Sequence, residues 1–147
     1  MPEGNTIGYL PSVVRVRATA LITNVVQFTD VVECRGFVWM MLYNEYVRGL
    51  AGGAVQLQVQ ASPALYGGWY PMTAYGVGAV AVNVDTASNI QRNTYIYGAT
   101  AAGAEGFLYG PFVLGNTVDR IRISFVEVGV PGTPGNWGCD VVFGVDR

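Results

Sequence analysis

The feature that most constrains the fold is a strict alternation of apolar and polar residues in the middle of the chain. Residues 54–60 read A-V-Q-L-Q-V-Q, so three aliphatic side chains alternate with three glutamines. Because successive side chains of a strand point to opposite faces, this pattern predicts a half-buried antiparallel strand. We expect Ser62-Pro63 to end that strand, Gly67-Gly68 to form a turn, and Trp69-Tyr70-Pro71 to begin another extended segment.

Comparable extended patterns recur along the whole chain, separated by Gly, Pro and Asn. The expected strands cover 13–23, 25–34, 37–43, 55–60, 77–84, 94–97, 107–114, 119–128 and 139–145. Residues 44–53 could form one helical turn, and the phase slip at Val126-Glu127 predicts a bulge. With no convincing amphipathic helix, the pattern predicts an all-β fold, an antiparallel β-sandwich or jelly roll of about eight to nine strands.

The chain is expected to form one domain with an extended arm. Residues 12–147 show no internal repeat and no linker, and their length suits a single core. Residues 1–11 are rich in Pro and Gly and form the arm. Either this arm is an ordinary terminal segment, or it is a strap that docks on a neighbouring subunit. The arm residues that we expect to act in assembly are Pro2, Ile7, Tyr9, Leu10 and Pro11.

The composition predicts a surface that is partly covered by other molecules. Charged residues make up only 12% of the chain, about half the usual share, while the apolar set reaches 51%. All eight basic residues are Arg. A monomer normally has a more charged surface, so we expect contacts with other subunits. The alternative is an ordinary domain from a genome that favours Arg, Gly, Ala and Val.

Several functional classes are not expected from the sequence. The longest unbroken apolar run, 37–43, is far shorter than the roughly 20 residues of a spanning helix, which predicts no membrane partner. The first residues show neither a basic segment nor an apolar core, so we expect synthesis in the host cytoplasm. A net charge of −2 offers no basic stripe for nucleic acid.

Catalysis is not expected either. The chain contains no histidine, which removes histidine metal ligands and Ser-His-Asp arrangements, and we predict no catalytic residue, no metal and no cofactor. The acids Asp85, Glu105, Asp119 and Glu127 are not spaced in a way that singles out a pair for glycoside hydrolysis. The G-x-G-x-x-A match at 76–81 is followed by strand sequence rather than a helix, so it does not predict a nucleotide site.

Two cysteines, Cys34 and Cys139, lie far apart in the sequence. They could form a disulfide if the fold brought them together. In a cytoplasmic product the favoured state is two buried free thiols.

Two sets of residues are candidates for subunit contacts. The run 37–43 has no polar face, so its strand should lie at the centre of a two-layer structure or at a subunit contact. The glutamine face of 54–60 is polar but uncharged, which also suits subunit packing. The interface candidates are Phe37, Trp39, Met41, Tyr43, Gln56, Gln58 and Gln60.

A third set could bind sugar. Carbohydrate-binding sandwiches stack sugar rings on aromatic side chains, and the candidates here are Tyr66, Trp69 and Tyr70, with Tyr75, Tyr95 and Tyr97 nearby in sequence. Core packing and subunit contacts are the alternative explanation of these aromatics.

Two segments carry a family resemblance. V-Q-L-Q-V-Q-A-S-P-A-L-Y-G-G-W-Y-P, residues 55–71, resembles a strand and turn common in small virion proteins of tailed bacteriophages. T-V-D-R-I-R-I-S-F-V-E-V-G-V-P-G-T-P-G, residues 117–135, is similar to the partner segment of that class. The chain departs from the pattern at Ala64-Leu65, where Asp-Gly is usual, and at Asp119, where an aromatic residue is common.

Within that class, the chain most resembles a capsid decoration, or head-stabilising, protein of a tailed bacteriophage, including phages of thermophilic hosts. The resemblance implies a homotrimer on the outer surface of the capsid that clamps neighbouring major capsid subunits. The alternative is a phage tail or baseplate protein, or a carbohydrate-binding β-sandwich module, that recognises host surface glycan through Tyr66, Trp69 and Tyr70.

Overall fold

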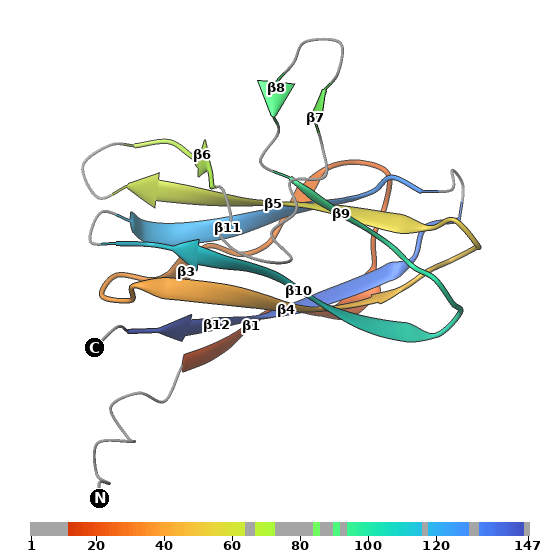
Figure 1. Ribbon diagram of the computed structural model, residues 1–147, viewed down its shortest axis with the longest axis horizontal. Helices are drawn as coiled ribbons and strands as arrows, with labels where there is room; N and C mark the ends of the chain where they lie inside the picture. The colour runs from red at the N-terminus through yellow and green to blue at the C-terminus, as the bar shows by residue number, and fades with distance from the viewer. Residues whose placement is uncertain are drawn as a thin grey trace, which may run out of the picture.

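The structure is a computed structural model, and it describes residues 12–63, 67–72, 84–85, 90–91, 94–115, 118–129 and 133–145. The expected arm 1–11, Tyr66 and nearly all of the expected strand 77–84 lie outside the described residues. Within the described ranges all regular structure is β-strand, arranged as two packed antiparallel sheets (Figure 1). The described part of the chain holds no helix long and apolar enough to cross a membrane.

The first sheet, sheet A, has four long strands. Their order is β1 (Ser12–Leu21), β12 (Asn136–Gly144), β4 (Trp39–Val47) and β10 (Ala104–Val113).

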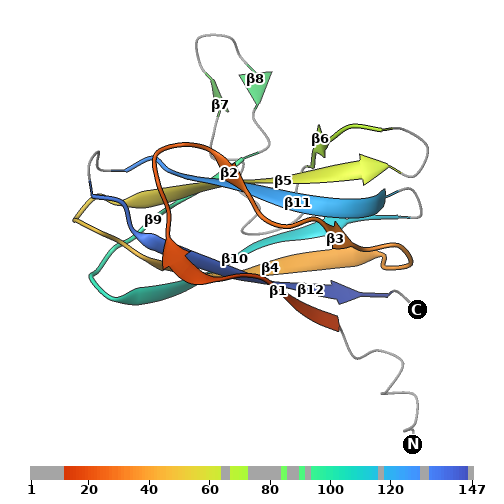
Figure 2. The ribbon, with the colours of Figure 1, turned by 180° about the vertical axis from the view of Figure 1, so that it is seen from behind.

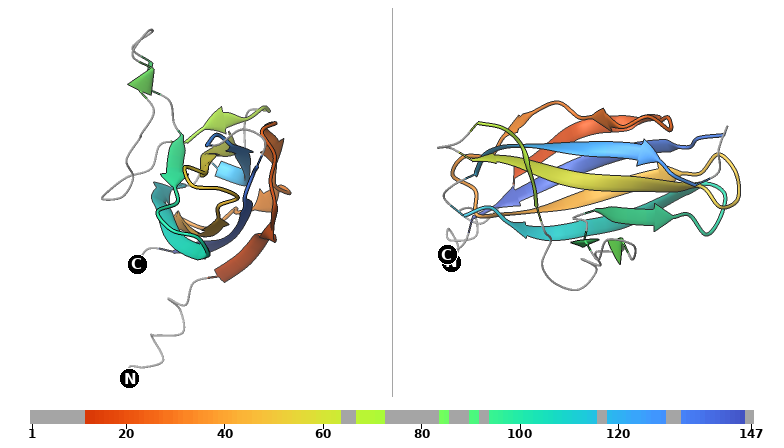
Figure 3. Two further views of the ribbon diagram at one scale, coloured as in Figure 1. Left: turned by 90° about the vertical axis from the view of Figure 1, so that its right-hand side faces the viewer. Right: turned by 90° about the horizontal axis from the view of Figure 1, so that it is seen from above.

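The second sheet, sheet B, has two long central strands, β11 (Val118–Glu127) and β5 (Ala54–Pro63), which lie side by side along the sandwich (Figure 3). Short strands β2 (Gln27–Phe28) and β3 (Val32–Glu33) flank β11, and β6 (Tyr70–Pro71) and β9 (Tyr95–Gly98) flank β5. A separate pair, β7 (Val84–Asp85) and β8 (Ile90–Gln91), completes the described strands.

The strand pairing is nested, which identifies the sandwich as a jelly roll. The first strand pairs with the last, and β2 and β3 pair with the last but one, β11, along which they run in Figure 2. Further in, β4 pairs with β10, and β5 pairs with β6 and β9. A jelly roll shows this nested pairing because a long antiparallel hairpin of strands is folded over to form its two sheets. The predicted all-β sandwich or jelly roll is therefore confirmed.

The alternation in 54–60 forms the centre of the core as predicted. Val55, Leu57 and Val59 are fully buried between the sheets, and Ile121 and Ile123 of β11 lie beside them. Sheet A contributes large inward side chains of its own. The fully buried ones are Trp137, Tyr46, Phe143, Phe112, Met40 and Leu42.

Aromatic rings fill one side of the core. Tyr97 stacks on Phe107 with centroids 4.1 Å apart, and Tyr95 stacks on Tyr109 at 5.0 Å. These pairs join sheet B to β10 of sheet A. Tyr95 and Tyr97 therefore contribute to packing between the sheets, which was the alternative explanation of their aromatic character.

Two local predictions were wrong, whereas the described strand β5 ends at Pro63 as expected. The expected helical turn after residue 43 is strand, because β4 continues to Val47. No register shift occurs at Val126-Glu127; β11 and β5 stay in phase there, and the irregularity lies between Val118 and Arg120. The apparent phase slip arises because Glu127 is a polar residue that points inward.

A bulge in β1 gives Arg15 and Arg17, two residues apart, different surroundings. The register of β1 against β12 shifts between Arg15 and Arg17. As a result Arg15 faces outward, whereas the guanidinium of Arg17 lies 4.7 Å from the ring centre of Phe125 and donates to the carbonyl oxygen of Trp137. The side chain of Arg17 also donates to the carbonyl oxygens of Ala18, Ala20 and Leu21.

Both cysteines are free and buried, as favoured from the sequence. Burial raises the pKa of the Cys34 thiol to about 12 and the pKa of the Cys139 thiol still further.

A buried carboxylate ties the two sheets together at the end of β11. Glu127 accepts hydrogen bonds from the Tyr46 hydroxyl (2.7 Å) and from the backbone N–H groups of Ala54 (3.0 Å), Gly135 (3.0 Å) and Gly129 (3.3 Å). A Cβ at either glycine would overlap neighbouring backbone atoms, so only glycine lets these amides approach. Burial, and then the bond to Glu127, raise the pKa of Tyr46.

We expect Glu127→Gln to lower the free energy of unfolding by about 2–4 kcal/mol, because a glutamine amide turns a donor toward backbone N–H groups and leaves them unsatisfied. Urea denaturation followed by tryptophan fluorescence measures the change. The matched control is Tyr46→Phe, which removes one of the four bonds and should cost about 1–2 kcal/mol. Equal stability of Glu127→Gln and wild type would contradict this role.

Candidate functional site

The outer face of sheet A exposes a band of apolar side chains. Tyr43 of β4 and Leu108 of β10 are directly opposite each other and are 50% and 51% exposed. Val113 is 53% exposed and lies opposite Trp39 at the other end of the same strand pair. Met41, between Trp39 and Tyr43, completes the outward row of β4. We name these five residues the sheet A band.

The band contains three of the predicted interface residues. Trp39, Met41 and Tyr43 alternate outward with the buried Met40 and Leu42, so β4 is apolar on both faces as its sequence suggested. The fourth candidate of that run, Phe37, precedes β4 and stacks on Phe143, with centroids 5.1 Å apart. Phe37 therefore packs against the core rather than joining the outward row.

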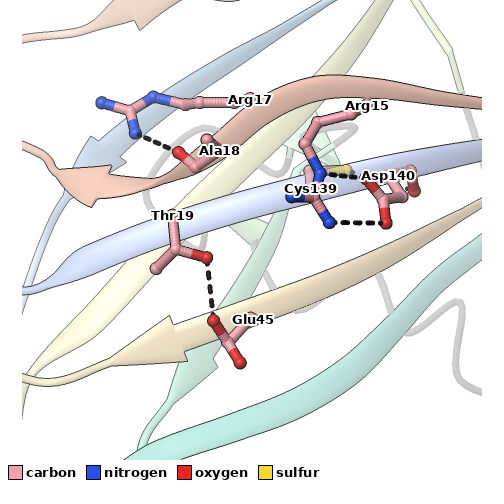
Figure 4. A network of polar contacts seen from close by, with 7 residues as sticks. All are labelled: Arg15, Arg17, Ala18, Thr19, Glu45, Cys139 and Asp140. Carbon is pink, nitrogen blue, oxygen red and sulfur yellow. Dashed lines mark hydrogen bonds and ion pairs between the residues drawn. The ribbon is translucent and has the colours of Figure 1, made fainter.

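A polar hollow lies beside the sheet A band, over β1, β12 and β4. Arg15 is paired with Asp140 across the strands, with Nε and Oδ1 2.9 Å apart, and the Thr19 hydroxyl donates to Glu45 at 2.8 Å (Figure 4). The hollow has a volume of about 240 Å³, and Tyr43 forms part of its wall. The bond to Asp140 raises the pKa of Arg15.

The remaining predicted interface residues, Gln56, Gln58 and Gln60, form a row on the outer face of sheet B. All three are half-buried rather than freely exposed. The Gln60 amide donates to the side-chain oxygen of Gln58 at 2.8 Å, and the Gln60 oxygen accepts a hydrogen bond from Nε of Arg122 at 2.8 Å.

Next to the glutamines, two arginines of β11 lie against aromatic rings: Arg122 between two of them, and Arg120 against one. The guanidinium carbon of Arg122 lies 4.0 Å from the ring centre of Phe28 and 4.4 Å from that of Trp69. Arg120 lies 5.5 Å from the ring centre of Trp69, and its guanidinium donates to the Ser62 hydroxyl at 3.0 Å. We name Phe28, Arg120, Arg122, Trp69 and Gln60 the arginine–aromatic cluster.

The predicted glycan platform is only partly described. Tyr66 lies outside the described residues. Trp69 belongs to the arginine–aromatic cluster, whereas the exposed Tyr70 pairs with the inward-facing Ala61 and its hydroxyl donates to the Gly67 carbonyl oxygen at 3.4 Å. The Trp69 ring lies against Arg120 and Arg122, whereas Tyr70 is placed opposite Ala61, so the two rings do not form one stacking surface.

Phe28, Arg120 and Arg122 are not among the site residues predicted from the sequence. The sequence contains one indication of the cluster: the alternation of β11 places both arginines on the sheet face where β5 places its glutamines. Recognising the cluster also requires the pairing of β11 with β5 and β2, which a single sequence does not provide.

The acids considered for catalysis are held in structural contacts where the structure describes their side chains. Asp119 accepts two hydrogen bonds from Arg35, which lower the pKa of its carboxyl. Glu105 accepts bonds from Thr100, Tyr97 and Ala101, and the bonds from Thr100 lower its pKa most. In the described ranges no three acidic or cysteine side chains gather as a metal site would require.

Comparison of the sequence with protein-family models finds no match, and comparison with curated proteins finds none. Solved structures are similar in fold. A chain of the infectious bursal disease virus Gt strain matches 92% of this chain with a TM-score of 0.51 and 8% identity. The VP2 subviral particle of infectious bursal disease virus matches 93%, with a TM-score of 0.51 and 6% identity.

A carbohydrate-binding module specific for non-crystalline cellulose is similar as well. It matches 98% of this chain and 91% of its own length, with a TM-score of 0.51 and 12% identity. The two viral matches cover 33% and 32% of the viral chains, so this chain spans about one third of their length. At these identities the likeness establishes the fold, which is shared by a viral particle protein and a carbohydrate-binding module.

Proposed function

We propose that the protein is a non-enzymatic structural component of a phage virion, which binds the outer surface of the capsid as a homotrimer and clamps neighbouring major capsid subunits. The main support is the sheet A band. Apolar side chains that are half exposed on a regular sheet face are favourable to cover, at about 25 cal/mol per Å². The resemblance of residues 55–71 and 117–135 to phage virion proteins and the low charge of the chain agree with this role.

The edge of sheet A offers a second contact. Strand β1 pairs with β12 on one side only in the described structure, and its side chains are exposed along most of its length. Unpaired edge strands with exposed apolar residues are sites of association. Residues 1–11 lead directly into this strand, so an arm that reaches a neighbour would extend the contact that β1 begins.

The trimer is tested by sedimentation of the wild type and of Leu108→Glu. We expect the wild type to sediment as three chains of 15.7 kDa. Glutamate in the sheet A band should weaken association about tenfold or more, because a charge would have to be desolvated. The control is Leu50→Glu, at a matched 50% exposure in the turn between β4 and β5. A wild-type monomer at micromolar concentration would refute the trimer.

Deletion of residues 1–10 tests the arm. The two sheets and their core are built from residues 12–145, so we expect the melting temperature to stay unchanged while occupancy on capsids falls. Occupancy is measured by co-sedimentation with expanded particles of the major capsid protein of the same phage. Full occupancy by the truncated protein would remove the arm from the mechanism.

A second candidate function is recognition of host surface glycan by a phage tail or baseplate component. The observation that favours it is the arginine–aromatic cluster, in which Trp69 and Phe28 present rings beside polar side chains. We expect Trp69→Ala to abolish adsorption to the host cell wall while the circular dichroism spectrum is retained. Adsorption that survives this substitution would exclude the cluster from glycan recognition.

A further inference from the structure

The arginine–aromatic cluster carries two positive charges, of which Arg120 interacts electrostatically with Asp119, a carboxylate that is already paired with Arg35. Arg15 and Arg35 are each paired with an aspartate, and Arg17 is satisfied by backbone carbonyl oxygens. Arg120 and Arg122 form no ion pair within the described part of the chain. Glu33 lies opposite Arg120 on β3, but no ion pair joins the two.

Both guanidinium groups are held by neighbouring side chains, and each uses one of its donors on a described partner. Each guanidinium has five N–H donors, and one of Arg122 is used on Gln60 and one of Arg120 on Ser62. The Phe28 ring makes a cation–π contact with the guanidinium group of Arg122, and the Trp69 ring makes such contacts with both guanidinium groups. The guanidinium groups of Arg120 and Arg122 lie two residues apart on one face of β11. A guanidinium group is planar and weakly hydrated, so the pair is suited to a planar anion with two oxygens, such as a carboxylate.

We infer that the outer face of sheet B binds an acidic polysaccharide, with Arg120 and Arg122 holding the carboxylate of a uronic acid residue. The inference rests on the second candidate function, glycan binding, and adds the charge of the ligand. The exposed part of the Phe28 ring and the edge of Trp69 contact the sugar ring, and the glutamine row supplies amide groups for its hydroxyls.

The surroundings of the cluster favour a carboxylated sugar over a peptide. A peptide that adds a strand needs a free sheet edge, but β11 and β5 are central strands with neighbours on both sides. Around the cluster the outward side chains of β5 are glutamine and serine, which suit hydroxyl groups. A polyphosphate is disfavoured because the chain has net charge −2 and the described part of this face offers two arginines outside the ion pairs.

The site is independent of the assembly face. The sheet A band and the arginine–aromatic cluster lie on the two opposite outer faces of the sandwich. A subunit docked through sheet A would leave the outer face of sheet B uncovered, so assembly and sugar binding can occur together.

The experiment titrates the full-length protein with oligosaccharides of galacturonic, mannuronic and glucuronic acid, each also supplied as its methyl ester. Isothermal titration calorimetry gives the dissociation constants. We expect at least one acid form to bind about tenfold or more tightly than its ester, which keeps the ring but removes the charge. Raising the salt concentration should weaken binding of the acid form only.

Arg122→Gln and Arg120→Gln should each weaken binding of the acid form about tenfold or more, and thermal melting checks that each variant is folded. The control is Arg48→Gln, which removes the same charge in the turn before β5, at the end of that strand far from Ser62. Its affinity should match the wild type.

The outcomes separate the two claims. Equal affinity for acids and esters, lost in Trp69→Ala, would overturn the inferred carboxylate recognition while supporting glycan binding. Absence of binding by every acid and every ester would overturn the inferred uronic acid recognition, while adsorption to the host cell wall that survives Trp69→Ala would overturn glycan binding by the cluster.

Discussion

The fold depends on packing two sheets around one apolar core. At one end of that core, the Glu127 carboxylate accepts hydrogen bonds from backbone N–H groups that would otherwise be buried without a partner. The side chains of Val55, Leu57 and Val59 stabilise the core by hydrophobic burial. Hydrophobic burial is non-directional, and the core of any β-sandwich provides it. Glu127 is directional: its four donors come from β4, from the start of β5, and from the segments on either side of the loop between β11 and β12. Removing it would leave buried N–H groups unpaired, which costs more than losing one apolar contact of similar size.

Much of the fold followed from local pattern, because alternation is a property of neighbouring residues. The V-Q-L-Q-V-Q segment predicts which side chains of β5 are buried, and the structure agrees. The errors arose where a contact distant in sequence decides the structure. Glu127 points inward because Tyr46 and two glycine amides meet it there, and Arg17 turns inward because a bulge in β1 brings it over Phe125.

The candidate site was less predictable than the fold for the same reason. Trp39, Met41 and Tyr43 could be selected because one strand with two apolar faces is visible in one segment. The arginine–aromatic cluster combines side chains from β2, β5, β11 and the segment before β6, and it exists only through the pairing of those strands. Trp69 was selected for its ring, but its arginine partners change the chemistry expected of it from neutral stacking to stacking beside positive charge.

The two outer faces of the sandwich differ in a way that the composition alone conceals. The band on sheet A is apolar, whereas the outer face of sheet B carries amides and two guanidinium groups close to aromatic rings. Low overall charge therefore does not mean a uniform surface: Arg15–Asp140 and Arg35–Asp119 are ion pairs, whereas Arg120 and Arg122 lie together in the cluster. Weak binding by one such cluster would be multiplied on a virion, since many copies of the subunit would present the same face to one polymer.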